Sequence, residues 1–556
     1  MLTDTDGRRS WLWPDGVTVA LLVAGTALRL WQYLGNPALW LDELAAAHNV
    51  ITRPLPGLLI ERLSDGQIAP PGFLVLSRAL VVAFGPSEYV LRLLSLLCSL
   101  ASLPVMARVA RRVLAPTGAV VAVALFSLSA GVAVFAADAK QYPCDVLVIL
   151  VLTDLGLGWL HAPTRRRLLT LVAAGVVLLW FSQPAVFVLA GLGGALLLGA
   201  AAKERRALVL PLVLWAVMAG LSLAYARSRM SPGLASFMTW FWREGFMPWP
   251  PRNLGDLLWP LGAVRGVFDE LLDFPWPALY VALALIGGVS LTRRRPAEAM
   301  LLLFPVCLTL AASIAHAFPF RVRVVLFVVP TLLLLVGEGA WWFGTLLRLR
   351  MFERLAPLAA AIPPLVMLAR NPPIWRFDDA RPVLAELQRE RRPGDVVYVY
   401  YPSWQAIRFY GERYGMPLPS VDLGSCQPEL RDYLRELDRY RGRERIWFVS
   451  AFEPPRTAET TSMLAYLDAI GRRKATIEGP RSNRPGALAT GRRYLDRPGT
   501  YAHLYDLSDS VRLASTTAEV QNLPPSVKFV GVPRCKYGPI IPQVPTVGDV
   551  RVDPEH

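Results

Sequence analysis

Apolar runs long enough to cross a membrane recur through the first two thirds of this chain. Residues 17–34, for example, read VTVALLVAGTALRLWQYL. A helix needs about 20 predominantly apolar residues to span the hydrocarbon of a bilayer. Hydrophobic residues make up 54% of the 556 residues, and the mean hydropathy is +0.38. The sequence therefore predicts a polytopic α-helical membrane protein and excludes a soluble globular one.

We predict about eleven transmembrane helices, each close to the length that a bilayer requires. They lie near residues 17–34, 89–107, 117–135, 143–160, 168–183, 185–202, 207–225, 276–291, 298–316, 322–340 and 355–369. The first run is too long for the apolar region of a signal peptide, and no small-residue cleavage site follows it. We therefore expect it to stay in the protein as a span.

Clusters of Arg and Lys occupy every second connection between these runs. They fall at residues 8–9, 108–112, 165–167, 203–206, 293–295 and 348–354. Because cytoplasmic loops carry an excess of Lys and Arg, we expect a cytoplasmic N-terminus, with the other connections and the C-terminal region outside. The formal net charge of +15 then reports topology, and we expect no nucleic acid as a partner.

The composition changes near residue 370 to that of a soluble domain. Residues 380–401, ARPVLAELQRERRPGDVVYVYY, predict an amphipathic helix, a turn and a strand of alternating Val and Tyr. QAIRFYGERYG then predicts a second helix, and RIWFVSAF a second strand. We therefore divide the chain into a transmembrane domain (1–370), an extracytoplasmic α/β domain (371–508) and an extended Pro-rich tail (509–556).

The five cysteines separate into two groups. Cys98, Cys144 and Cys307 fall in or at the edge of spans, where a small core residue is the expected role. Cys426 and Cys535 are the two in the exported region, where oxidation is permitted. A disulfide between them and a pair of separate thiols both remain open, because spacing does not supply the geometry that a disulfide requires.

Polar residues collect in three of the predicted outer connections. Charges at membrane depth are costly, so they usually face a cavity or pair with one another. Together these residues suggest a polar site under the outer leaflet. The residues are Asp42, Glu43, His48, Asp65 and Gln67 in the first connection, Asp138, Lys140 and Tyr142 in the second, and His316, Arg321 and Arg323 near the penultimate span.

Several of these stretches resemble the membrane glycosyltransferases of the GT-C class. They are Arg29 in the first span, WLDE after it, APPGFLVLSRALVVAFGPSEYVLRLLSLL, FAADAKQYP and FPFRVRVVLFVVP. The group they resemble is glycosyltransferase family 39-like and contains protein O-mannosyltransferases and the aminoarabinose transferases of lipid A. The resemblance extends over residues 17–370.

The resemblance implies transfer of a hexosyl or pentosyl group from a polyprenyl-phosphate donor to an acceptor on the non-cytoplasmic face of a bacterial inner membrane. The acceptor would be a hydroxyl of a lipid, a glycan or a protein. The acidic motif of the group maps onto Asp42 and Glu43, and its first acidic residue is taken to be the catalytic base. Glu43 then orients Asp42, binds the acceptor or faces water.

The chemistry of such a transfer agrees with the residue types. An attacking hydroxyl must lose its proton, and the Asp42 carboxylate is a suitable base. The leaving phosphate is stable as an anion, so it needs cations and no second acid, and backside attack inverts the anomeric centre. For phosphate binding we predict Lys140, Tyr142 and Arg321 or Arg323. The two arginines are two positions apart, so on one helix they diverge and one of them faces the site.

Other roles remain open for several of these residues. Lys140 and Tyr142 also suit snorkelling and an aromatic belt, and Asp138 is expected either to pair with Lys140 or to serve the site. His316 with a carboxylate would suit a divalent metal, but no tight ligand spacing such as HExxH appears, so we assign no metal ligand and leave a divalent metal as a possible cofactor. A transporter or flippase, and a non-catalytic membrane scaffold, are the alternative functions.

An aromatic segment, MTWFWREGFMPWPPRNLGDLLWP, lies in a long outer loop predicted near residues 226–275. Aromatic faces are common platforms for sugars, and Trp favours the headgroup region. We predict that this loop, through Trp240 and Trp242, and the apolar stretch 72–84 gate the acceptor and seat the polyprenyl chain. An aromatic belt without substrate contact is the alternative.

Overall fold

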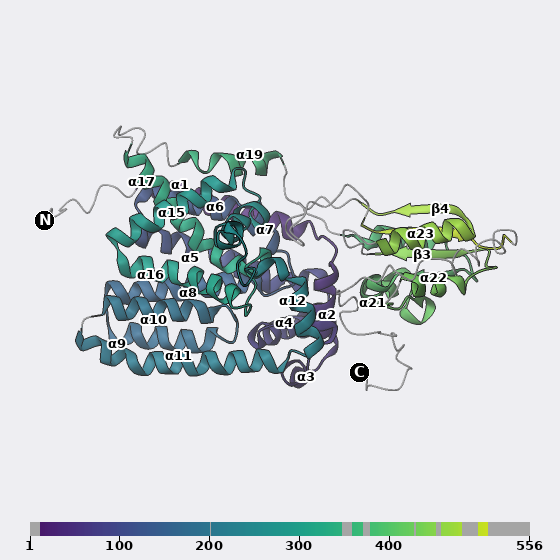
Figure 1. Ribbon diagram of the computed structural model, residues 1–556, viewed down its shortest axis with the longest axis horizontal. Coiled ribbons are helices and arrows are strands. Elements are labelled where there is room, and N and C mark those ends of the chain that lie inside the picture. The colour runs from purple at the N-terminus through teal and green to yellow at the C-terminus, as the bar shows by residue number, and fades with distance from the viewer. Residues whose placement is uncertain are drawn as a thin grey trace.

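The structure is a computed structural model that describes residues 12–200, 202–346, 358–370, 378–427, 430–451, 458–480 and 499–509. Figure 1 shows a large helical part and a smaller part with a β-sheet beside one of its ends. The predicted tail from residue 510 onward lies outside the described residues.

The predicted apolar runs form helices. Their bounds are α1 (Leu12–Leu34), α5 (Glu88–Val113), α6 (Pro116–Leu128), α7 (Ala130–Phe135), α8 (Tyr142–His161), α9 (Arg165–Leu178), α10 (Ala185–Gly199), α11 (Ala202–Ser228), α15 (Pro277–Arg294), α16 (Pro296–Ile314), α17 (Val329–Leu346) and α19 (Ile362–Arg370). The predicted run 117–135 is divided at Ser129, which ends α6 and caps α7 by accepting a hydrogen bond from Val132 N (3.3 Å).

Six helices in the described part of the chain are long and apolar enough to cross a membrane. They are Gly16–Leu34, Glu88–Val113, Tyr142–His161, Arg205–Ser228, Pro296–Ile314 and Val322–Thr345. The other predicted runs form shorter or more charged helices, down to the nine residues of α19. Length and composition alone therefore support a polytopic membrane protein with six such helices, and the predicted total of eleven is not established by them.

The outer connections are more helical than the sequence suggested. The first contains α2 (Leu41–Thr52), α3 (Leu55–Ile60), η1 (Ser64–Gly66) and α4 (Pro71–Phe84). The predicted long loop near 226–275 is a series of short helices: α12 (Pro232–Phe241), η2 (Arg243–Gly245), α13 (Leu254–Leu257), α14 (Trp259–Gly266) and η3 (Val267–Leu271). The reason is local, because prolines at the first helical positions of α12 and α14 set the backbone for a helix start.

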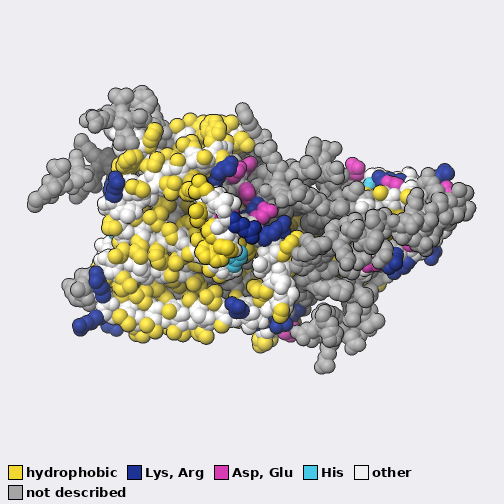
Figure 2. All heavy atoms as spheres, in the orientation of Figure 1, with side chains coloured by type: hydrophobic (Ala, Val, Ile, Leu, Met, Phe, Trp, Pro, Cys, Tyr) yellow, Lys and Arg dark blue, Asp and Glu magenta, His cyan; other side chains and the backbone are white. Residues whose placement is uncertain are grey.

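The alternating connections meet at two opposite ends of the helical part. At the basic end Arg112 pairs with Asp154 (2.8 Å), Arg295 donates to Arg112 O (2.9 Å) and His161 lies 3.4 Å from Glu298. Hydrophobic side chains cover much of the helical part between its ends, and charged groups gather where the sheet part joins it (Figure 2). These contacts therefore bring three of the six predicted basic connections to one end of the helical part, and residues 8–9 and 348–354 lie outside the described residues.

Glycines let two helices, α15 and α17, pack closely. A Cβ at Gly287 of α15 would meet Leu335 O of α17 at 1.9 Å, and one at Gly339 would meet Leu283 O at 1.9 Å. Only a residue without a side chain permits this approach of two backbones, a common way to join helices in a membrane.

The smaller part is the α/β unit that the sequence predicted. Its elements are α20 (Ala380–Glu390), β1 (Val396–Val399), η5 (Tyr401–Ser403), α21 (Trp404–Tyr410), η6 (Gly411–Tyr414), η7 (Leu418–Ser420), β2 (Asp422–Leu423), α22 (Leu430–Asp438), β3 (Ile446–Ser450), α23 (Ala458–Ile470), β4 (Arg472–Glu478) and β5 (Tyr501–Asp506). The strand order is β2-β1-β3-β5-β4; β1 is parallel to β2 and β3, and β5 is antiparallel to β3 and β4. We call residues 378–509 the sheet unit.

One apolar cluster joins the sheet unit to the helical part. It contains Leu39 and Leu44 near the start of α2 together with Ile407 and Tyr410 of α21. Because these side chains are almost fully buried, the start of α2 is packed between the two parts.

The cysteines agree with the prediction only in part. Cys98 and Cys144 are free and their Sγ atoms lie 3.0 Å apart between α5 and α8. Cys307 is free but exposed on α16, so the predicted core role is wrong for it. Cys426 is disulfide-bonded. Cys535 lies outside the described residues, so its pairing with Cys426 stays a prediction.

Candidate active site

Asp42 and Glu43 occupy the first turn of α2, and their side chains point to different neighbours. Adjacent residues on an α-helix are rotated by about 100° from each other, so two carboxylates in sequence cannot share one environment. Trp40 is the N-cap of this helix, and its backbone N–H donates to Glu43 Oε2 (3.2 Å). The pair is therefore divided between a buried role and a more accessible one.

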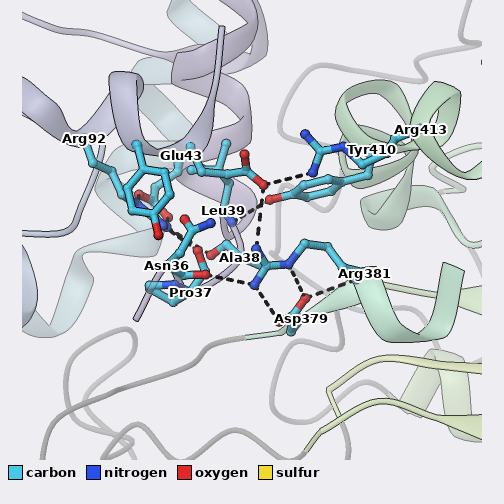
Figure 3. A network of polar contacts seen from close by, with 12 residues as sticks. Asn36, Pro37, Ala38, Leu39, Glu43, Arg92, Asp379, Arg381, Tyr410 and Arg413 are labelled. Atoms are coloured by element: carbon cyan, nitrogen blue, oxygen red, sulfur yellow. Dashed lines mark hydrogen bonds and ion pairs between the residues drawn. The ribbon is translucent and has the colours of Figure 1, made fainter. Parts of the chain in front are cut away.

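Glu43 is 1% exposed and bound on all sides (Figure 3). Arg92 of α5 donates from Nε to Oε1 (2.8 Å) and from Nη2 to Oε2 (2.6 Å), and Ala139 N donates to Oε1 (2.7 Å). Arg92 is itself 2% exposed. Of the three expected roles for Glu43, facing water is wrong, and the contacts are those of a residue that orients α2.

Asp42 forms an ion pair with Arg323, which is a residue of η4 (Val322–Val328). The Asp42 side chain is 21% exposed and the Arg323 side chain 4%. Arg323 Nε also donates to the Tyr142 hydroxyl at the start of α8 (3.1 Å). Three predicted site residues from three separate connections are thus in direct contact.

Two indole rings flank the Arg323 guanidinium. Its Cζ lies 4.8 Å from the ring centroid of Trp40 and 5.4 Å from that of Trp242. Such contacts stabilise a cation by roughly 0.5–2 kcal/mol. Arg323 Nη1 is buried and finds no hydrogen-bond partner among the described residues. The site therefore contains a fixed cation with one N–H group available to an anion.

Lys140 contacts another predicted site residue, Gln67. It is 7% exposed, and its Nζ donates to Gln67 Oε1 (2.5 Å) beside a pocket that Asn49 and Phe73 also line. Asp138 is 3% exposed and lies within electrostatic range of Arg323, Arg92 and Tyr142. Asp138 therefore belongs to the surroundings of the Asp42 site.

Arg321 and Arg323 diverge, as their spacing predicted. Arg321 Nη1 pairs with Glu244 of the aromatic segment (2.8 Å), and its Nη2 pairs with Glu270 of η3 (3.2 Å). Burial raises the pKa of Glu270 above its usual range, and Arg321 opposes that rise. Arg321 thus holds the aromatic segment in place, and Arg323 is the arginine that faces Asp42.

His316 and Trp240 also lie in the aromatic segment's surroundings. His316 Nε2 is 2.9 Å from Met247 O, and its ring stacks on Phe246 with centroids 5.1 Å apart. The Arg243 guanidinium lies over the Trp240 ring, with its Cζ 5.3 Å from the ring centroid. Within the described residues, no group of three His, Cys, Asp or Glu side chains is placed to hold a metal ion. Metal dependence therefore stays an open prediction.

The sequence analysis missed Arg92, Glu88 and Tyr410. A signal for Arg92 was present, because an arginine inside an apolar run needs a partner, but the first outer connection offers several carboxylates and the sequence does not choose among them. Glu88 is 4% exposed and pairs with Arg413 of the sheet unit (3.4 Å). No pattern in the sequence indicates that contact or the one that Tyr410 makes with Leu39 N (2.9 Å).

Comparison with known proteins finds similar solved structures only. No protein-family model matches the chain, and no curated protein matches it. ArnT from Cupriavidus metallidurans in the apo state is 15% identical, with 87% of this chain and 97% of that chain covered and a TM-score of 0.46. The same protein bound to undecaprenyl phosphate is 14% identical, with 89% and 98% covered and a TM-score of 0.44.

An archaeal protein is also similar. The oligosaccharyltransferase AglB from Archaeoglobus fulgidus, in complex with an inhibitory peptide and a dolichol-phosphate, is 13% identical, with 84% of this chain and 73% of that chain covered and a TM-score of 0.48. These two proteins are GT-C glycosyltransferases, the class that the sequence resembles.

Proposed function

We propose that this chain is an integral membrane glycosyltransferase that moves a hexosyl or pentosyl group from a polyprenyl-phosphate donor to an acceptor hydroxyl. The observation that carries the proposal is the contact between Asp42 and Arg323 beneath two indole rings. It places a partly accessible carboxylate beside a buried guanidinium whose Nη1 has no hydrogen-bond partner among the described residues. A base for a hydroxyl and a cation for a phosphate are the two groups that this transfer needs.

Arg323 has a larger effect on the transition state than on the bound donor. The sugar phosphate of the donor is a diester with one negative charge, and breaking the anomeric C–O bond adds a second charge to the departing phosphate. A fixed guanidinium in a poorly solvated site stabilises that developing charge without having to reorganise. Tyr142, which already accepts a hydrogen bond from Arg323 Nε, keeps the guanidinium in orientation.

Asp42 becomes available as a base when the donor binds. Without substrate, Asp42 and Arg323 neutralise each other. An incoming phosphate competes for Arg323, and a carboxylate released from that pair accepts the proton of the acceptor hydroxyl. Attack from the side opposite the phosphate inverts the anomeric centre.

The membrane arrangement is part of the proposal. We place the Asp42 site outside the cytoplasmic membrane of a bacterium, with about eleven spans, a cytoplasmic N-terminus and an exported sheet unit. A phosphatase that folds only outside the cytoplasm should be active when fused after residue 508 and inactive when fused after residue 162. The reverse pattern would place the site in the cytoplasm.

The deciding experiment is transfer by the purified protein in lipid nanodiscs. It uses a panel of labelled sugars on undecaprenyl and dolichol phosphates, and the labelled product is identified. Asp42→Asn should abolish transfer, whereas Asp269→Asn should not, because Asp269 forms a surface pair with Arg265 and is 53% exposed. Donor that crosses the bilayer of proteoliposomes without sugar transfer would instead indicate a flippase, and neither activity would indicate a scaffold.

A further inference from the structure

The five residues before α2 belong to no helix or strand. Side chains from elsewhere in the protein form hydrogen bonds with their backbone. Arg92 Nη1 donates to Pro37 O (2.5 Å) and its Nη2 to Ala38 O (3.0 Å). Glu43 accepts from Trp40 N (3.2 Å). We call residues 36–40 the hinge segment. Its position is set by side chains and not by its own secondary structure.

The sheet unit supplies the remaining contacts to the hinge segment (Figure 3). Leu39 N donates to the Tyr410 hydroxyl (2.9 Å), and Arg381 Nη2 donates to Asn36 O (3.0 Å). Tyr410 ends α21 and is 0% exposed; Arg381 lies in α20. Two elements of the sheet unit therefore reach across to a segment more than 340 positions earlier in the chain.

Residues outside the hinge segment also hold the Arg381 guanidinium in place. Its Nε and Nη2 donate to the two oxygens of Asp379 (2.9 and 2.8 Å), and Nη1 lies 3.7 Å from buried Glu88. Arg413 pairs with the same Glu88 (3.4 Å). A guanidinium fixed by several partners loses little further freedom when it makes one more contact.

The hinge segment leads directly into the site. It ends at Trp40, whose ring lies on Arg323, and Asp42 follows two residues later. Because Leu39 and Asp42 are joined through one turn of backbone, a shift of the Leu39 amide moves the carboxylate as well. The turnover of an enzyme falls by as much as about 100-fold when a catalytic group is displaced by about 1 Å.

We propose that Tyr410 and Arg381 are positioning residues for Asp42, so that the sheet unit completes the active site through the hinge segment. The proposal rests on the proposed function of Asp42, and it adds a role for the exported unit that the Asp42 chemistry alone does not require. Tyr410 and Arg381 touch no reacting atom. They act by holding the backbone that places Asp42.

Tyr410→Phe is the direct test, because it removes one oxygen and keeps the ring in the apolar cluster. We expect kcat to fall by about 10-fold to 100-fold while the KM for the polyprenyl-phosphate donor stays within about twofold, since Arg323 keeps its charge and its hydrogen bond to Tyr142. The matched control is Tyr440→Phe. Tyr440 donates to Asp422 (2.9 Å) within the sheet unit, and its loss should leave both constants at the wild-type values.

Hydrogen exchange supplies a readout that does not depend on activity. In the purified full-length protein, the peptide that contains residues 36–43 should exchange faster in Tyr410→Phe than in wild type or Tyr440→Phe. If wild type transfers no sugar from any donor, the proposed function fails, and this exchange difference still decides whether Tyr410 holds the hinge segment.

A second variant covers the case in which Tyr410→Phe does not fold. Arg381→Gln removes the contact with Asn36 O, and its control is Arg445→Gln, which breaks a pair with Asp395 (2.7 Å) inside the sheet unit. We expect the same kcat loss and faster exchange for Arg381→Gln only. Wild-type kcat in either positioning variant, or an equal loss in its control, would overturn the proposal.

Discussion

Glu43→Gln should unfold the start of α2, although it changes the side chain by little more than one atom. The four hydrogen bonds to Glu43 come from Arg92 Nε (2.8 Å), Arg92 Nη2 (2.6 Å), Ala139 N (2.7 Å) and Trp40 N (3.2 Å). All four are donors. A glutamine has only one carbonyl oxygen that can accept hydrogen bonds. Its amide nitrogen is itself a donor, and it would face two of the four donors.

The expected loss of folding free energy follows from the number of hydrogen bonds that Glu43→Gln removes. Two hydrogen bonds to a charged group, at about 1.5–3 kcal/mol each, amount to about 3–6 kcal/mol. The same change leaves the Arg92 guanidinium, 2% exposed, without its counter-charge, and removing one partner of a buried pair costs about 3–5 kcal/mol. Either value is a large share of the roughly 5–15 kcal/mol that holds a typical fold together.

The assay is thermal unfolding in detergent, with sugar transfer measured on the same preparations. Glu43→Gln should lower the unfolding temperature sharply, and its transfer should fall with the amount of folded protein. Asp42→Asn should lower the unfolding temperature less, because Asp42 is 21% exposed and an asparagine keeps one oxygen that can accept a hydrogen bond from Arg323. Its turnover should nevertheless fall by roughly 100-fold or more, the loss expected for a general base.

A double variant separates the charge from the shape of the pair. Glu43→Met with Arg92→Leu replaces a buried ion pair by apolar side chains, an exchange that is often neutral for stability. We expect it to unfold at a higher temperature than Glu43→Gln. The reasoning would be refuted if Glu43→Gln were as stable as wild type, or if Asp42→Asn were the less stable of the two single variants.

Three further predictions concern donor binding, the aromatic segment and pH. Arg323→Lys should raise the donor KM by roughly 10-fold, since a lysine cannot reproduce the fork that binds Asp42, Tyr142 and an anion together, and one charge-assisted hydrogen bond is worth at least about 1.5 kcal/mol. Trp242→Ala should lower transfer and raise the ratio of donor hydrolysis to transfer, because its ring covers Arg323. Burial lowers the pKa of His48 to about 4 from a usual 6.5, so its contribution to folding is complete above pH 6.5 and is lost as the pH falls towards 4.

Each of these predictions has a matched control. Arg321→Lys should leave the donor KM unchanged, because Arg321 pairs with Glu244 and Glu270, and an equal effect of both arginine variants would place the phosphate elsewhere. Trp240→Ala tests the other ring that the sequence assigned to this gate, and if Trp240→Ala and Trp242→Ala both keep the wild-type ratio of hydrolysis to transfer, the two rings are anchors. Unfolding of His48→Gln should depend less on pH between 6.5 and 4, and an unchanged slope contradicts a buried neutral imidazole.

Local patterns in the sequence were sufficient for the elements. The apolar runs became helices, and the predicted strands in VVYVYY and RIWFVSAF became β1 and β3. These features depend on the length, periodicity and charge of short stretches, which the chain carries wherever it folds. The prediction of a long loop was wrong for residues 226–275, where a proline at the first helical position begins α12.

The separate roles of the site residues could be assigned only from the tertiary structure. Asp42 and Glu43 are adjacent in sequence, yet one pairs with Arg323 and the other with Arg92. Arg321 and Arg323 diverge as expected, but they do not share a helix, because Arg321 is the extended residue before η4. No pattern in the sequence decides which of them faces Asp42.

The sequence by itself determined that this chain crosses a membrane repeatedly, which connections share a side, and which polar residues the outer connections bring to one end. Only the tertiary structure decided the partner of each charge. Arg92 is 49 positions from Glu43, and Tyr410 is 371 positions from Leu39. Such pairings depend on how helices and sheet pack in three dimensions, because a buried charge or amide takes whichever partner the packed fold brings within about 3 Å.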